Sequence, residues 1–213
     1  MEVLLRKRIM KFFSYIKSVI LKYKKRNVQS LRMRRKNLDF LEELAVPSGY
    51  QIRTYRRGDE ESWVRIIESS FGHGYDAWHP NINEIVNDKE FDPNSLFFVT
   101  YQNNPIGTAC ALRRSPNGQN VGYVHMVAVT PEHQGKKLGR LLVLCTLHYF
   151  KEKGFHEVVL NTEDHRLPGI KTYLDLEFEP VYLGSDHRRR WEAIFENLNK
   201  FNKRKSHAGN LTF

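Results

Sequence analysis

A glycine-containing loop between an apolar strand and an amphipathic helix is the segment of this sequence that could bind an anion. The run Val127-Ala128-Val129 is followed, after Pro131, by Gln134-Gly135-Lys136-Lys137-Leu138-Gly139-Arg140 and a predicted helix. Backbone N–H groups at a helix start have no intrahelical partner and favour a phosphate. The two glycines allow close backbone approach, and Lys136, Lys137 and Arg140 add positive charge.

Spacing alone leaves an ordinary strand-to-helix turn as the alternative to an anion site. Two other phosphate motifs are excluded, because GxGxxG is absent and a P-loop requires GxxxxGK followed by Ser or Thr. Nine histidines invite a metal hypothesis, but HExxH and paired ligand spacings are also absent, so we expect no metal. Cys110 and Cys145 form no CxxC and are expected to be reduced core residues.

The elements around the loop alternate between strands and helices. We predict strands at 51–56, 95–101, 106–113, 121–129, 156–160 and 178–183, and helices at 60–70 (capped by Gly58-Asp59), 82–88, 138–153, 167–174 and 186–201. The 95–129 strands form an antiparallel meander. The strand, crossover helix and strand from 121 to 160 form a βαβ unit with parallel neighbours. A mixed α/β domain over 31–205 with a tail at 206–213 is therefore expected.

The loop resembles the GNAT acyltransferase superfamily, whose motif reads roughly V-x-P-x-x-[RQ]-x-x-[GA]-x-[GA]. The matching positions are Val129, Pro131, Gln134, Lys137 and Gly139. Lys137 stands where the family prefers Gly or Ala. We expect it in the first helical turn, where it needs no positive φ.

A second segment is similar to the family pattern N-x-x-A-x-x-L-Y-x-x-x-G-F. Tyr173 and Phe178 match, whereas Arg166, Gly169 and Glu177 replace the Asn, Ala and Gly. The resemblance implies a GNAT fold, an α/β (α+β) arrangement with a mixed central sheet of six to seven strands flanked by helices. The superfamily adds a seventh strand after the sixth. Because a helix follows here, we expect that strand to be absent or supplied by 211–213, in a monomer or a homodimer with swapped segments.

The resemblance implies an N-acetyltransferase that moves an acetyl group from acetyl-CoA to a primary amine of a small molecule or peptide. The pantetheine arm would pair with the backbone of Val127, Ala128 and Val129, and the pyrophosphate would bind Gln134, Gly135, Lys136, Lys137, Leu138, Gly139 and Arg140. Tyr173 would protonate the departing thiolate, and Glu163, Asp164 or His125 could take the amine proton. The alternative is a catalytically weak sensor that binds acetyl-CoA, or an interaction module that uses the basic amphipathic N-terminal arm at a membrane or a partner.

The N-terminal arm concentrates the positive charge of the chain. Of the formal net charge of +10, residues 1–45 carry +9, with 13 Lys and Arg against 4 Asp and Glu. Apolar residues from Leu5 to Tyr23 fall on one helical face, so residues 1–30 read as a basic amphipathic helix. Residues 1–26 could bind an anionic membrane, or they could dock as a helix on this protein or on a partner. Binding to nucleic acid fits the apolar face less well. We expect a cytoplasmic protein, with peripheral contact at the inner membrane face left open.

Overall fold

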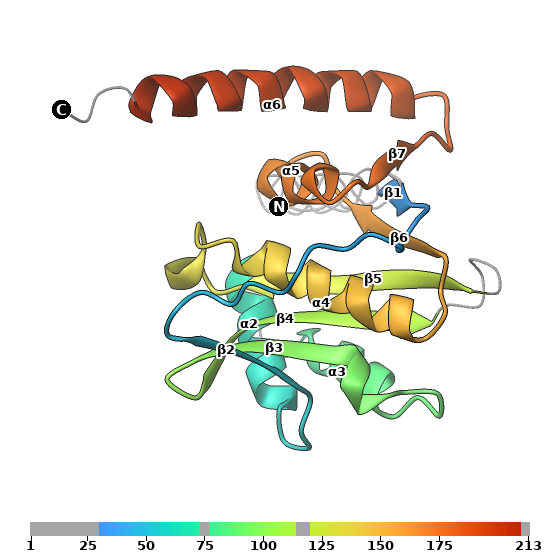
Figure 1. Ribbon diagram of the computed structural model, residues 1–213, viewed down its shortest axis with the longest axis vertical. Helices are drawn as coiled ribbons and strands as arrows, with labels where there is room; N and C mark the ends of the chain where they lie inside the picture. Colours follow the sequence, from blue (N-terminus) through green and yellow to red (C-terminus); the bar gives the residue numbers. More distant parts are fainter. Residues whose placement is uncertain (1–29, 73–76, 114–119, 210–213) are drawn as a thin grey trace, which may run out of the picture. The chain divides into compact units, whose positions relative to one another are not determined.

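One mixed sheet of seven strands organises the chain (Figure 1). The computed structural model describes residues 30–72, 77–113 and 120–209, with side chains as far as Lys200. The strand order is β2-β3-β4-β5-β6-β1-β7, and the bounds are β1 Leu31–Arg35, β2 Tyr50–Thr54, β3 Leu96–Tyr101, β4 Asn104–Arg113, β5 Val121–Val129, β6 Glu157–Thr162 and β7 Glu179–Val181. All neighbours are antiparallel except β5 and β6, which are parallel. The predicted mixed sheet is confirmed.

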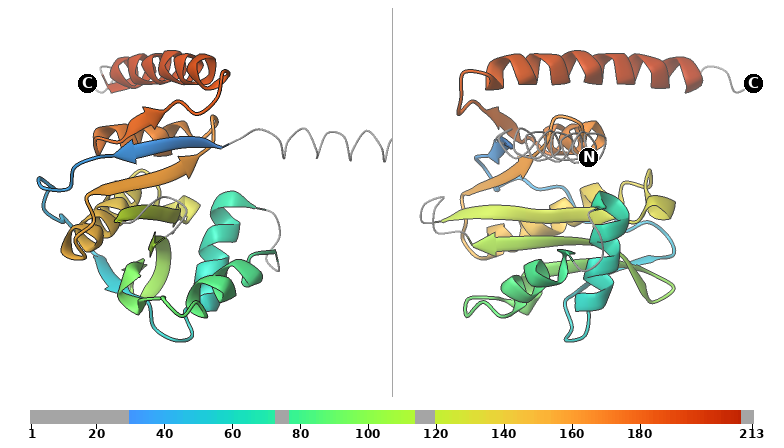
Figure 2. Two further views of the ribbon diagram at one scale, coloured as in Figure 1. Left: turned by 90° about the vertical axis from the view of Figure 1, so that its right-hand side faces the viewer. Right: turned by 180° about the vertical axis from the view of Figure 1, so that it is seen from behind.

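The helices cover both faces of this sheet. Their bounds are α2 Glu60–Phe71, α3 His79–Val86, α4 Leu138–Glu152, α5 Leu167–Asp175 and α6 His187–Gly209. Figure 2 shows α2 and α3 on one face and α4 on the other. Strand β7 is shorter than predicted and holds Pro180, which is tolerated at a sheet edge because no further strand needs its N–H. Helix α6 runs past the predicted end because it meets no glycine or proline before Gly209.

Strand β1 corrects the expectation that a seventh strand is absent or comes from the C-terminus. Leu31–Arg35 lies between β6 and β7 and pairs antiparallel with both. Leu31 and Met33 are fully buried, and Arg32 and Arg34, which alternate with them, are half-buried on the other side. The sequence predicts no strand here, because four of the six residues from Leu31 to Lys36 are Lys or Arg. Residues 211–213 lie outside the described part of the chain.

Arg35 holds β1 to the chain that follows it. Its side chain is almost completely buried, and its guanidinium donates to the carbonyl oxygens of Asn37 (2.8 Å), Phe40 (2.9 Å) and Leu176 (2.6 Å). It also pairs with Glu177 at 2.8 Å. A buried charge is tolerated when its donors are satisfied in this way. These bonds fix the beginning of a segment without regular structure, residues 36–49, which we call the strap.

Helix α4 packs tightly on the sheet. Ten of its fifteen residues are buried. The ring of Phe150 lies over Gly122 in β5, where a Cβ atom would stand 2.6 Å from the ring. Glycine at this position therefore allows the helix to approach the strand that carries the predicted cofactor residues.

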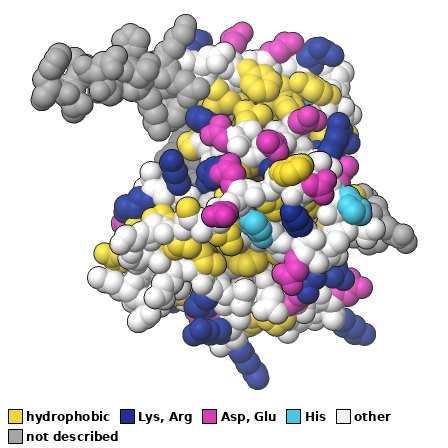
Figure 3. Space-filling model, in the orientation of Figure 1, with side chains coloured by type: hydrophobic (Ala, Val, Ile, Leu, Met, Phe, Trp, Pro, Cys, Tyr) yellow, Lys and Arg dark blue, Asp and Glu magenta, His cyan; other side chains and the backbone are white. Residues whose placement is uncertain are grey.

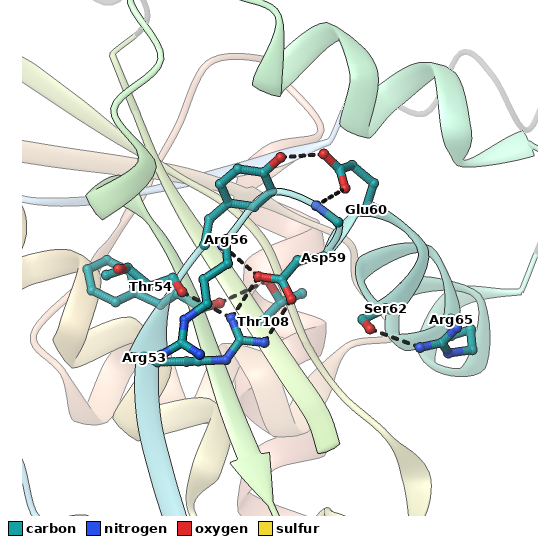
Figure 4. Close-up of polar contacts among 11 residues, drawn as sticks. Arg53, Thr54, Arg56, Asp59, Glu60, Ser62, Arg65 and Thr108 are labelled. Atoms are coloured by element: carbon teal, nitrogen blue, oxygen red, sulfur yellow. Dashed lines mark hydrogen bonds and ion pairs between the residues drawn. The ribbon is translucent and has the colours of Figure 1, made fainter. Parts of the chain in front are cut away.

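An ion pair fixes the start of α2 (Figure 4). Asp59 is the residue before the helix, but its carboxylate makes no capping bond to the first turn; it accepts from Arg53 Nη1 (2.6 Å), Arg53 Nη2 (2.7 Å) and the backbone N–H of Arg56 (2.7 Å). Burial alone would raise the pKa of Asp59, but these hydrogen bonds outweigh it and lower the pKa. Asp59 thus precedes the helix as predicted, but its side chain pairs with Arg53 and does not cap the first turn.

No helix of the described residues is long and apolar enough to cross a membrane. The predicted basic helix of residues 1–30 lies outside the described ranges, apart from its last residue.

Candidate functional site

The segment of residues 130–139, which comprises the connection after β5 and the first two residues of α4, is called the Gln134 loop. It makes one turn of 3-10 helix at Pro131–His133 and then extends through Gln134. Two positive φ values follow, 78° at Gly135 and 60° at Lys137, and α4 begins at Leu138. The expectation that Lys137 needs no positive φ is therefore wrong. A lysine in this conformation is strained, because its Cβ atom crowds the backbone at a positive φ.

The Gln134 loop forms one wall of a cavity of about 1000 Å³, which we call the Tyr173 cavity. Nearly all the predicted site residues line it, namely Val127, Ala128, Val129, Gln134, Gly135, Lys137, Leu138, Gly139, Arg140 and Tyr173. Lys136 is not among the lining residues; its ammonium donates to the carbonyl oxygen of Glu132 at 3.2 Å. The structure thus brings together one strand, one helix start and one distant tyrosine.

The second half of β5 has an edge that no strand within the described ranges covers. Strand β5 pairs with β6 only from Val121 to Val124. Beyond this point Met126 has a φ of 52°, and the β4–β5 register shifts so that two residues, 126 and 127, stand opposite one residue of β4. Such a bulge bends a strand and releases its edge from the sheet. The backbone that leads into the Gln134 loop is therefore open to an extended ligand.

Backbone pairing shows which groups of β5 face this opening. The N–H of Thr130 donates to the carbonyl oxygen of Ile106, so by alternation the N–H and carbonyl of Val129 point away from β4. The Val129 carbonyl already accepts from Gln134 Nε2 (2.9 Å) and Ser70 Oγ (3.1 Å). The Val129 N–H is the group left for a ligand at this residue.

Tyr173 enters the cavity from α5. Its ring packs edge-on against Phe178 at a centroid distance of 6.0 Å, and its hydroxyl makes no hydrogen bond with any residue in the described ranges. Burial raises the pKa of Tyr173 to about 12, against a smaller opposing effect of Arg166. The phenol is thus protonated at neutral pH.

Residues 60–178 match the family model described as the acetyltransferase (GNAT) family. The chain belongs to this family. It is 30% identical over 179 residues to the mycothiol acetyltransferase of Rhodococcus erythropolis, covering 76% of this chain and 58% of that protein. The chain spans about half the length of the curated relatives it matches.

Two solved structures show the GNAT fold of this chain. A GCN5-related N-acetyltransferase from Sphaerobacter thermophilus aligns with a TM-score of 0.56 and 17% identity, over 78% of this chain and 53% of that chain. An aminoglycoside N-acetyltransferase in complex with CoA aligns with a TM-score of 0.52 and 21% identity, over 66% of this chain and 95% of that chain. At sequence identities this low, the similarity to these two structures shows a shared fold only.

The three predicted proton acceptors of this GNAT protein occupy different surroundings. The carboxylate of Asp164 pairs with Arg190 at 2.6 Å, and the hydrogen bond from Arg190 lowers the pKa of Asp164. Glu163 is half-exposed and pairs with Arg166 at 3.3 Å. His125 lines a different cavity of about 180 Å³, beside α3. None of the three lines the Tyr173 cavity, and Asp164 is a poor base because its pairing favours the ionised form.

Three charged residues that line the Tyr173 cavity were not predicted from the sequence. Glu42 comes from the strap, and Lys171 and Asp175 come from α5. The spacing of Lys171 and Asp175 could have predicted an ion pair across one helical turn, which the structure contains at 2.7 Å. Nothing in the sequence around Glu42 indicates its position, because the strap has no periodic pattern.

Proposed function

We propose that this protein transfers an acetyl group from acetyl-CoA to a primary amine in a ternary complex. The observation that carries the proposal is the Tyr173 cavity, which joins the Gln134 loop, the open edge of β5 and an unpartnered tyrosine hydroxyl. Membership of the GNAT family and a fold neighbour solved with CoA support the choice of coenzyme.

The Gln134 loop is suited to the pyrophosphate of the coenzyme. Its N–H groups precede α4, so they meet the positive end of the helix dipole. Gly135 and Gly139 have open space where a Cβ atom would be, which lets a phosphate approach the backbone. Lys137 and Arg140 line the same wall and add positive charge.

The pantetheine arm would lie along β5 as an added strand. The Val129 N–H is available to it, and the bulge at Met126 turns the preceding backbone toward the opening. A backbone N–H of this segment would stabilise the oxyanion that forms when the amine attacks the thioester, an effect worth roughly 3 kcal/mol per donor.

Direct attack by the amine needs no nucleophile from the enzyme. Both cysteines are free and buried, and burial raises the pKa of Cys145 to about 11, so this thiol stays protonated and unreactive. In the direct route the neutral amine bonds to the carbonyl carbon, and its proton passes to water or a base. The C–S bond then breaks, and Tyr173 gives its proton to the thiolate and regains one from solvent.

For the acceptor we propose a small-molecule amine, and mycothiol-related amines come first because the matched relatives are mycothiol acetyltransferases. The test is the release of free CoA thiol from acetyl-CoA with and without each member of an amine panel. We expect at least one amine to raise thiol release above the hydrolysis background. Binding of acetyl-CoA without amine-dependent release by any member would favour the sensor alternative.

A further inference from the structure

The strap brings a carboxylate to the wall of the Tyr173 cavity. It crosses α4 (Figure 1) and is attached to three of its turns. Lys151 Nζ donates to the carbonyl oxygen of Asp39 (2.5 Å), His148 Nε2 lies 2.8 Å from the carbonyl oxygen of Glu42, and Arg140 Nη2 lies 2.5 Å from Glu42 Oε1. The strap precedes the segment matched by the family model, residues 60–178. Glu42 therefore lies outside the segment that the family model matches.

Most of the cationic side chains that line this cavity already form ion pairs with carboxylates. Three Lys and Arg side chains line it: Lys137, Arg140 and Lys171. Arg140 pairs with Glu42, and Lys171 pairs with Asp175, whereas Lys137 forms no ion pair within the described ranges. Across the face of the molecule that carries α4, acidic and basic side chains are interspersed (Figure 3). A phosphate that enters the cavity therefore meets one unpaired cation and two that hold carboxylates.

We propose that Glu42 sets the affinity for the coenzyme by competing with its phosphate groups for Arg140. The inference rests on the proposed function, because it requires coenzyme A to occupy the Tyr173 cavity. The Glu42 side chain is 63% exposed and that of Arg140 is 25% exposed, so the carboxylate can turn to solvent when a phosphate takes its place. Competition of this kind weakens binding and speeds release of the CoA product.

The geometry makes this role separable from anchoring of the strap. Two of the three attachments to α4 use backbone carbonyls, those of Asp39 and Glu42, and neither depends on the carboxylate of Glu42. Glu42→Gln keeps the size of the side chain and removes its charge. If Glu42 had a purely structural role, Glu42→Gln would therefore change the stability of the fold without raising the affinity for the coenzyme.

The test is calorimetric titration of CoA into the full chain and three single variants at low ionic strength. The first is Glu42→Gln. The second is Glu179→Gln, which makes the same change of net charge on β7, outside the cavity. The third is Arg140→Gln, also combined with Glu42→Gln. We expect Glu42→Gln to lower the Kd about five-fold because it frees the Arg140 guanidinium to pair with a phosphate group. Glu179→Gln should leave the Kd unchanged, and the gain should vanish in the Arg140→Gln background.

Two results would overturn the inference while leaving the proposed function intact. The first is that the wild-type chain binds CoA and the Glu42→Gln variant binds it no more tightly. The other is an equal gain with and without Arg140, which would show that the carboxylate acts without its partner. If the wild-type chain itself does not bind CoA, the proposed function fails first.

Discussion

The side-chain amide of Gln134 donates a hydrogen bond to the backbone carbonyl of Val129, 2.9 Å away. This bond joins the Gln134 loop to the strand from which it departs. A second donor, Ser70 Oγ from α2, reaches the same carbonyl at 3.1 Å. The Val129 carbonyl is thus held by one side chain from the loop and one from α2. These bonds orient the N–H groups around Gly135 before a ligand binds.

Gln134→Ala should weaken acetyl-CoA binding. The loop loses its tie to Val129, and the ordering of its backbone must then be supplied by binding, so we expect about a ten-fold higher Kd. Calorimetric titration measures this change. Gln51→Ala, on the exposed side of β2, is the matched control and should bind like wild type. An unchanged Kd in Gln134→Ala would show that the bond does not organise the loop.

Tyr173→Phe should lower turnover without weakening acetyl-CoA binding. The ring still packs against Phe178, whereas the proton for the thiolate is lost, so kcat should fall roughly 100-fold. Thiol release gives kcat, and titration gives the Kd of acetyl-CoA. Tyr182→Phe, an exposed tyrosine outside the cavity, should retain full activity. Equal kcat values for wild type and Tyr173→Phe would remove Tyr173 as the proton donor.

Replacing Lys137 should separate backbone strain from charge. At a φ of 60°, glycine is unstrained and alanine is not, so Lys137→Gly should be more stable than Lys137→Ala by about 1 kcal/mol. Both variants lose the ammonium group and should bind CoA more weakly than wild type. Urea denaturation gives the two free energies of unfolding. Equal stabilities would argue against a left-handed residue at the start of α4.

Asp59 should contribute stability that depends on pH. Its pKa is lowered in the folded state, so its contribution is present above the unfolded pKa of about 3.9 and is lost as pH falls through the folded value. Asp59→Asn should therefore be less stable than wild type by about 2 kcal/mol at pH 7, and the gap should close as the pH falls through the folded pKa of Asp59. Urea denaturation at several pH values checks this.

The control for Asp59 is Glu196→Gln, an exposed carboxylate on α6. This change should leave both the free energy of unfolding and its pH dependence as in wild type. A gap between wild type and Asp59→Asn that stays constant down to pH 2 would contradict the role of the ionised pair.

The elements that could be predicted from the sequence are those with a periodic hydrophobic pattern or a local motif. The apolar run of β5, the apolar stripe of α4 and the glycines of the Gln134 loop are local signals, and all three lie in the structure where they were expected. Tyr173 could be assigned to the cavity only through the resemblance, because a tyrosine on a short helix more often packs in a core.

The remaining features depend on contacts between distant residues. Strand β1 lies 126 positions before β6 in sequence and reads as a basic segment, and its pairing with β6 and β7 becomes visible only when all three are in place. Glu42 is likewise brought to Arg140 by a strap without a pattern. The positive φ of Lys137 opposes the preference of its side chain, so propensity predicted the wrong conformation.

The central claim is that acetyl-CoA occupies the Tyr173 cavity along the Gln134 loop and the open edge of β5. Backbone amide chemical shifts of the isotope-labelled chain, recorded during titration with acetyl-CoA, test it most directly. We predict that the largest shifts occur at the amides of residues 134–140 and at Val127 and Val129. Saturable shifts confined to the residues of the smaller cavity beside α3, with the Gln134 loop unperturbed, would contradict the claim.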